Sequence, residues 1–305
     1  MQKFYSNGKL LLSGEYLILD GALGLALPTF YGQEMIIKST PSTGILLWDS
    51  LDERGDRWLE ASFNLPDLTL TGFTGQEKAA STLQRILLEA KKANSTFLNS
   101  TEGIHVTTKL QFPRDWGLGS SSTLINNIAL WADSDAFELL FNSFGGSGYD
   151  IACAKIDQAI LYKLDQGLPE FKPVVFDPSF KDQLFFVHLN KKQVSSESIK
   201  NYRKKPIDQQ MIKDVSVLSK MILAAKTLIE FEVLLKKHES MLAGILGIAP
   251  VQKRLFPDYK GQIKSLGAWG GDFILATGDE TTPTYFKQKG FDTVIPYATM
   301  IKNND

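Results

Sequence analysis

The sequence predicts an α+β protein with antiparallel sheets and two domains. The chain has 305 residues, which is long enough for a large core and a second domain. Segments with strand character and segments with helical periodicity occur in both halves of the chain. From Gln158 the sequence pattern changes to short apolar segments separated by short polar loops. We therefore expect a domain boundary near residues 165–167, with domains at 1–165 and 166–305.

Composition excludes several classes of partner. Hydrophobic residues make up 43% of the chain and charged residues 22%, and the formal net charge is −1. This is typical of a soluble globular protein, and no bulk charge draws it to nucleic acid or to an anionic membrane. No segment approaches the roughly 20 apolar residues that span a bilayer, and the first residues do not resemble a signal peptide. Cys153 is the single cysteine, which fits a reducing compartment. We expect a cytoplasmic protein, monomer or homodimer, with a small-molecule substrate.

The first half of the chain opens with apolar segments. Residues 9–19 predict a buried strand interrupted at Ser13, Gly14 and Glu15, and residues 23–27 predict the next strand after an Asp20-Gly21 turn. Further strands are expected at 33–38, 44–49, 57–63 and 103–112, the first two as an antiparallel pair, and helices at 76–92, 136–141 and 151–155.

The second half predicts shorter strands and a long helical region. The helical pattern over 207–237 indicates two helices broken near Lys226. Further helices are expected at 241–248 and 282–289, and strands at 159–164, 173–176, 184–189 and 293–296, with a glycine turn feeding a strand within 264–277.

The serine-rich loop, residues 116–123, is the segment most suggestive of a ligand. Gly117 and Gly119 allow a tight turn and a close approach to a ligand, and four hydroxyl residues then open a helical pattern. Free N–H groups at a helix N-terminus attract anions, so the loop suits a phosphate group. A serine-capped helix after a glycine turn is the alternative interpretation. The loop is not a Walker motif, because no Gly-Lys-Ser/Thr follows it.

Two further glycine loops and one lysine complete the candidate set. The second glycine loop, residues 145–150, ends at Asp150, which is either a helix N-cap or a general base. The third glycine loop, residues 267–272, is either a β-turn or a loop that closes over a ligand. Lys9 begins an apolar strand, so its ammonium either reaches solvent or points into a cleft.

These residues together fit phosphoryl transfer. That reaction needs a phosphate cradle, a cation and a group that orients the nucleophile. In chain order, Lys9 supplies the cation, the serine-rich loop the cradle, and Asp150 the group that orients the nucleophile. The three histidines, His105, His188 and His238, form no metal-spaced pair and no plausible catalytic triad, which argues against hydrolase and zinc chemistry.

At these residues the chain resembles the GHMP kinases, the family of galactokinase, homoserine kinase, mevalonate kinase and phosphomevalonate kinase. Residues 8–20, here called the first motif, are similar to the first family motif, and residues 117–121 to its ATP phosphate loop. Residues 146–150 resemble the segment with the catalytic aspartate, and the third glycine loop resembles the third motif. The matches span nearly the whole chain.

The resemblance implies a two-domain GHMP kinase fold. The expected parts are an N-terminal α/β domain with a left-handed βαβ unit and a ferredoxin-like C-terminal domain, with ATP and substrate between them. Lys9 and Asp150 would be catalytic, and Mg²⁺ would bind Ser121 and Glu138, although Glu138 matches the family spacing poorly. The implied ATP-binding residues are Trp116, Gly117, Leu118, Gly119, Ser120, Ser121 and Ser122. The implied substrate-binding residues are Glu15, Tyr16, Ser147, Gly148, Ser195, Ser196, Gly270 and Gly271.

Within the family the chain is most similar to phosphomevalonate kinases. Gly-Glu-Tyr at residues 14–16, the aromatic Trp116 before Gly-Leu-Gly, and Gly-Gly-Asp at 270–272 support this, as does the serine-containing segment 191–198. The expected reaction is ATP-dependent phosphorylation of phosphomevalonate or mevalonate. Trp269, where the family usually has glycine, and Ser122 depart from the pattern. A catalytically silent metabolite-binding or sensor protein is one alternative, and a mevalonate diphosphate decarboxylase, whose serine loop differs, is another.

Overall fold

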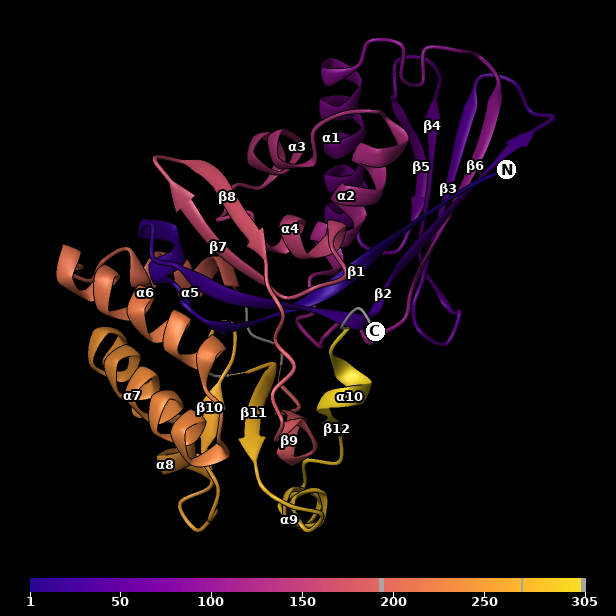
Figure 1. The fold of residues 1–305 in the computed structure, drawn as a ribbon. Coiled ribbons are helices and arrows are strands. Elements are labelled where there is room, and N and C mark those ends of the chain that lie inside the picture. Colours follow the sequence, from indigo (N-terminus) through magenta and orange to yellow (C-terminus); the bar gives the residue numbers. More distant parts are fainter. Residues whose placement is uncertain (192–194, 270, 303–305) are drawn as a thin grey trace. The chain divides into compact units, whose positions relative to one another are not determined.

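The computed structural model describes residues 1–191, 195–269 and 271–302 (Figure 1). The chain forms two compact units that interleave in sequence. Unit 1 comprises Met1–Gly8, Tyr31–Arg114 and Leu118–Lys155, and unit 2 comprises Lys9–Phe30, Asp115–Gly117 and Ile156–Asp305. Unit 2 thus takes two segments from the first half of the chain. A domain boundary at residue 165 stays a prediction.

Unit 1 is built on a mixed sheet. The strands are β2 (Gly24–Thr40), β3 (Ile45–Leu51), β4 (Arg57–Asn64), β5 (Leu70–Thr74) and β6 (Gly103–Leu110), in the order β5–β4–β3–β6–β2, and β1 (Gln2–Ser13) also pairs with β2. The long strands β1 and β2 each supply residues to both units. Strand β3 is parallel to β6, whereas β2 is antiparallel to β6 and β4 is antiparallel to both β3 and β5.

The predicted antiparallel pair of residues 33–38 and 44–49 is wrong. Both segments are strands, but β6 lies between them, with Gln33 of β2 opposite Leu110 and Leu46 of β3 opposite Ile104. Neighbouring strands in the sequence are only usually neighbours in a sheet. The later strand β6 instead pairs with β2 from Gln33 to Thr40.

Four helices of unit 1 lie on one face of this sheet: α1 (Glu77–Ala93), α2 (Ser120–Trp131), α3 (Ala136–Ser143) and α4 (Tyr149–Lys155) (Figure 1). Helix α1 confirms the periodicity of residues 76–92, because Leu83, Ile86, Leu87 and Ala90 are buried along one side. These side chains belong to the same hydrophobic core as Trp48 of β3.

Unit 2 contains a hairpin and a separate small sheet. In the hairpin, β7 (Ile160–Asp165) pairs with Gly24–Ala26 of β2 and with β8 (Leu168–Pro173). The small sheet is antiparallel in the order β10 (Ile263–Ser265), β11 (Phe273–Thr277), β9 (Leu184–His188), β12 (Val294–Pro296). The strand expected at 173–176 is wrong, since β8 lies earlier and ends at Pro173. The segment 264–277 forms two paired strands with the third glycine loop between them.

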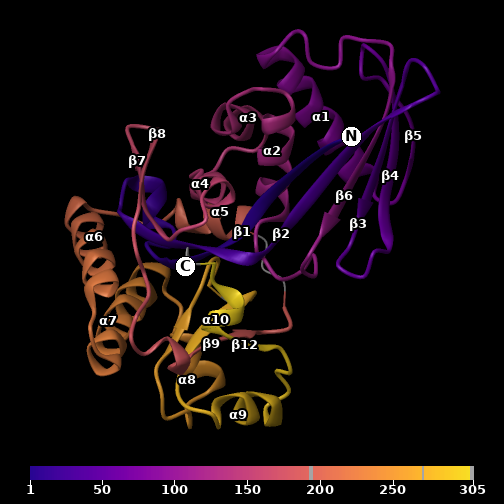
Figure 2. The same ribbon diagram turned by 45° about the vertical axis from the view of Figure 1, so that its right-hand side comes forward.

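The long helices of unit 2 pack side by side (Figure 2). They are α6 (Gln209–Ala224) and α7 (Leu228–Leu246), and Thr227 caps α7 by accepting from the Glu230 N–H. The break near Lys226 is therefore confirmed. A separate helix at 241–248 is wrong, because α7 continues to Leu246. The remaining helices are α5 (Ser195–Tyr202), α8 (Val251–Leu255), α9 (Thr282–Gln288) and α10 (Tyr297–Met300), with a 3-10 turn η2 (Lys181–Gln183).

The first motif is shorter as a strand than residues 9–19 predict. Strand β1 ends at Ser13, and a 3-10 turn, η1 (Leu17–Asp20), follows. Gly14 makes this possible, because its φ is +92° and a Cβ there would lie 2.7 Å from the Gly24 Cα. The α+β class is confirmed. Among the described residues, no helix combines the length and apolar composition needed to cross a bilayer.

Candidate active site

Lys9 lies against the serine-rich loop. It is half-buried near the middle of β1, and its Nζ donates to the Gly117 carbonyl oxygen at 2.9 Å. Both residues belong to unit 2. The strand thus aims a cation at the first glycine of the loop rather than leaving it on an open surface.

The residues just before Gly117 are anchored on the small sheet of unit 2. The Trp116 ring meets the Phe273 ring edge to face, with centroids 5.3 Å apart and planes at 89°, and lies 6.2 Å from the His188 ring. The His188 Nε2 is 3.3 Å from the Asp115 carbonyl oxygen. Strands β9 and β11 therefore hold the start of the serine-rich loop in place, which gives His188 a structural role.

The end of the third glycine loop packs directly on Gly117. Gly117 has φ +68°, and a Cβ there would lie 2.5 Å from the Asp272 carboxyl carbon. Asp272 itself has φ +53°, and its N–H donates to the Lys191 carbonyl oxygen at 2.7 Å. No role was predicted for Asp272 from the sequence. The signal that could have identified it is an acidic residue at the end of a glycine loop, which is weak on its own.

The residue at the N-cap of helix α2 is a glycine and not a serine. Gly119 is the N-cap residue, with φ +89°, and no side chain caps the helix. The serine-cap interpretation is therefore wrong. Ser120 follows as the first helical residue, with Ser121 exposed and Ser122 buried. Uncapped N–H groups behind a glycine turn are the arrangement that binds phosphate oxygens.

Asp150 lies in the first turn of α4, the helix that follows the second glycine loop. It is the second residue of this helix and not its N-cap. Gly148 has φ +85°, and its carbonyl oxygen accepts from Ile151 N–H at 3.0 Å. Ser122 Oγ is 3.5 Å from Asp150 Oδ2, so within unit 1 the aspartate faces the start of α2. Ser147, another predicted site residue, is buried beside this turn.

The two predicted metal ligands are exposed. Ser121 is in the first turn of α2, and Glu138 is in the first turn of α3. Within the described ranges, no group of three His, Cys, Asp or Glu residues could hold a metal ion. Hydroxyl and carboxylate oxygens suit Mg²⁺, which usually keeps only one or two protein ligands and takes the rest from phosphates and water. The oxygen donors of Ser121 and Glu138 are thus of a type that suits Mg²⁺, and their binding of this ion stays a prediction.

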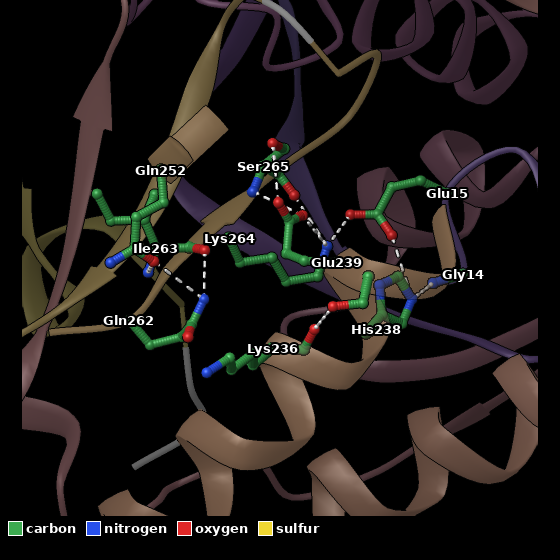
Figure 3. Close-up of polar contacts among 11 residues, drawn as sticks. Gly14, Glu15, Lys236, His238, Glu239, Gln252, Gln262, Ile263, Lys264 and Ser265 are labelled. Carbon is green, nitrogen blue, oxygen red and sulfur yellow. Dashed lines mark hydrogen bonds and ion pairs between the residues drawn. The ribbon is translucent and has the colours of Figure 1, made fainter. Parts of the chain in front are cut away.

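Glu15 is buried in a cluster of charged side chains (Figure 3). It is 1% exposed and pairs with the Lys264 ammonium, while its Oε2 is 3.5 Å from His238 Nε2. Burial raises the pKa of Glu15, and Lys264 opposes that rise. Burial and the nearby Lys264 hold the pKa of His238 well below its usual value, and burial raises the pKa of Glu239 to about 7. A role for Glu15 in substrate binding stays a prediction.

The Tyr16 side chain is buried and packs against another aromatic ring. Its ring stacks on that of Tyr202 at the end of α5, with centroids 5.2 Å apart. Trp269 is 3% exposed and belongs to the same hydrophobic cluster. The bulky ring of Trp269, a departure from the family pattern, is thus part of the interior of unit 2.

The remaining predicted substrate residues are only partly described. Ser195 and Ser196 are the first residues of α5. Gly271 is buried, and Gly270 lies outside the described residues.

The comparisons with known proteins agree on the fold. No protein-family model and no curated protein sequence matches the chain. Methanococcus jannaschii mevalonate kinase superposes with a TM-score of 0.72 at 13% identity, covering 99% of this chain and 98% of that one. Streptococcus pneumoniae phosphomevalonate kinase in complex with phosphomevalonate and AMPPNP gives 0.69 at 17% identity, covering 95% and 96%. Lactococcus lactis galactokinase complexed with galactose gives 0.70 at 15% identity, covering 99% and 94%.

Because these neighbours cover nearly the full length of both chains, the likeness is one of the whole fold and not of a shared fragment. The chain therefore has the two-domain fold of the GHMP kinases, the family that its motifs resemble.

Proposed function

We propose that this protein is an ATP-dependent GHMP-type kinase that transfers the γ-phosphoryl group of ATP to phosphomevalonate or mevalonate. The observation that carries the proposal is the contact between Lys9 Nζ and the Gly117 carbonyl oxygen at 2.9 Å. This bond holds a lysine ammonium beside a glycine loop that leads into a helix N-terminus. Phosphoryl transfer uses such a cation to neutralise the charge of the phosphates.

The local geometry of each unit supports the proposed roles. The uncapped N-terminus of α2 and the serine hydroxyls bind the phosphates of ATP. Lys9 holds the transferring group, and Asp150 acts as a base or electrostatic partner for the acceptor. Mg²⁺, held by Ser121 and Glu138, would neutralise charge on the phosphates. That Lys9 and Asp150 act on one substrate is part of the proposal.

The acceptor is inferred from the first motif and from a fold neighbour. Tyr16, where mevalonate kinases tend to have histidine, favours a phosphomevalonate-like acceptor. The Streptococcus pneumoniae phosphomevalonate kinase has the same fold and binds phosphomevalonate and AMPPNP. We expect the protein to act in the cytoplasm as a monomer or homodimer.

The test is a coupled ADP-release assay with mevalonate, phosphomevalonate, homoserine and galactose, with and without Mg²⁺. Asp150→Asn should lower kcat by about 100-fold or more, because it removes a proton acceptor while keeping the shape of the side chain. Asp56→Asn, at an exposed turn of the same unit, is the matched control.

Calorimetry with AMPPNP should show that Asp150→Asn still binds nucleotide. Full turnover by Asp150→Asn would refute the role of this aspartate. Nucleotide binding by the wild-type protein without turnover of any acceptor would instead support the silent metabolite-binding alternative.

A further inference from the structure

Lys264 is a fully buried lysine in β10, at 0% exposure. Its Nζ contacts the Glu15 carboxylate, donates to the Ser265 carbonyl oxygen at 2.8 Å and lies 3.9 Å from Glu239 Oε1 (Figure 3). All of these residues belong to unit 2. A buried ammonium costs much of its hydration, and a well-packed apolar side chain would often stabilise such a position better. Stability alone therefore does not explain why a charged lysine occupies this position.

The contacts around Lys264 join the first motif to helix α7. The Gly14 N–H donates to His238 Nε2 at 3.1 Å, and Glu15 Oε2 is 3.5 Å from the same nitrogen. His238 therefore accepts at Nε2, which requires a neutral imidazole there. The turn that ends β1 is thus held by one histidine of α7 and by one lysine of β10.

A second set of contacts joins α7 to β10, the strand that leads into the third glycine loop. Glu239 Oε1 accepts the Ser265 N–H at 3.0 Å, and Glu239 Oε2 lies 3.3 Å from Ser265 Oγ. Two residues after Ser265 the third glycine loop begins, and its last residue, Asp272, packs on Gly117. Lys264 thus stands between the strand that carries Lys9 and the loop that contacts Gly117.

From this arrangement we infer that Lys264 is a positioning residue of the proposed kinase site. Through Glu15 it fixes the turn after β1, and through its own strand it fixes the third glycine loop, so that Lys9 and Gly117 meet in one arrangement. The inference rests on the proposed function for its kinetic consequence, but the coupling of the two segments is independent of it. An ion pair has a directed geometry that an apolar pair lacks. This geometry favours a single position of the turn after β1 relative to the strand β10.

The test uses Lys264→Met, Glu15→Gln and the double variant. Phe286→Leu is the control, because Phe286 is fully buried in the core beside the small sheet, and shortening it should destabilise unit 2 without removing any of the charged groups around Lys264. The first readout is amide hydrogen exchange in residues 10–19 and 263–269. Lys264→Met should speed exchange in both segments together, whereas Phe286→Leu should leave the first segment unchanged.

The second readout is kinetic. Lys264→Met should lower kcat/KM by about 100-fold, the loss expected from a misplacement of about 1 Å at a reacting centre. Because the two side chains act as a pair, the double variant should lose no more than the worse single variant. Additive losses, or kinetics and exchange equal to those of Phe286→Leu, would overturn the inference.

If Lys264→Met does not fold, the double variant decides, because it leaves no partner charge of the pair buried alone; unchanged exchange in both segments would then refute the inference. If the wild-type protein phosphorylates no acceptor, the proposed function fails, and the exchange experiment still decides whether Lys264 couples the two segments.

Discussion

Gly117 shows how one residue type can be required by two independent constraints. Its φ of +68° lies in the left-handed region, and the Asp272 carboxyl group fills the space that a side chain would need. Gly14 also meets both constraints, whereas some other glycines meet only the first. Gly167 has φ +85° and open space around its Cβ position. Comparing Gly117 with Gly167 therefore separates the effect of backbone strain from the effect of steric overlap.

We predict that Gly117→Ala lowers AMPPNP affinity at least about tenfold, which corresponds to about 1.4 kcal/mol. The new Cβ must displace Asp272 and move the carbonyl group that accepts from Lys9. Gly167→Ala, in the same unit, should cost about 1–2 kcal/mol of backbone strain and leave affinity unchanged. Calorimetry and denaturant unfolding measure the two effects, and equal affinities for both variants would contradict the prediction.

At the scale of elements, local chemistry determines where helices start. The Asp135 side chain accepts from the N–H groups of Phe137 and Glu138 at 2.7 and 3.0 Å, and so caps α3. Thr227 likewise caps α7 and explains why the helical pattern breaks near Lys226. Such signals lie in neighbouring residues, so helices such as α1, α3 and α9 lie close to where the sequence predicts them, whereas α5, α8 and α10 were not predicted.

Removing the cap of α3 should therefore have a small and local effect. Asp135→Ala is expected to lower the free energy of unfolding by about 1 kcal/mol, because two N–H groups lose their acceptor. Asp135→Asn keeps an acceptor oxygen and should lose much less. Denaturant unfolding of both variants is the measurement, and equal destabilisation by alanine and asparagine would show that the charge, not the hydrogen bonds, matters.

Strand partners are decided at longer range. Residues 33–38 and 44–49 were correctly identified as strands, but their pairing was wrong because β6, more than 50 residues later, lies between them. Likewise the apolar run from residue 9 to 19 predicted one strand, whereas Gly14 ends β1 by a close approach to Gly24. Neither partner can be recognised from the local pattern.

At the scale of the whole molecule, the buried cluster links protonation to global stability. Burial raises the pKa of Glu239 from 4.5 to about 7, so the folded protein binds a proton there that the unfolded chain has already released. The contribution of Glu239 to the free energy of unfolding is fully present below pH 4.5 and is lost as the pH rises to about 7. The lowered pKa of His238 acts in the opposite direction, so a variant is needed to isolate Glu239.

We predict that the free-energy difference between the wild-type protein and Glu239→Gln changes by up to about 1.4 kcal/mol per pH unit between pH 4.5 and about 7. The wild-type protein should lose stability relative to the variant as the pH rises. Glu280→Gln, at an exposed position, should show no such trend. Denaturant unfolding across this range is the measurement, and parallel curves for all three proteins would contradict it.

The sequence by itself determined the fold class, the positions of several helices such as α1, α3 and α9, and the glycine loops with their candidate residues, because periodicity and glycine turns depend on residues close together in the chain. Tertiary structure alone decided which segments meet. It paired Lys9 with Gly117, set Asp272 against that glycine, and placed Glu15 beside Lys264, 249 residues away in the chain. Such contacts depend on packing between distant segments, and no local pattern encodes them.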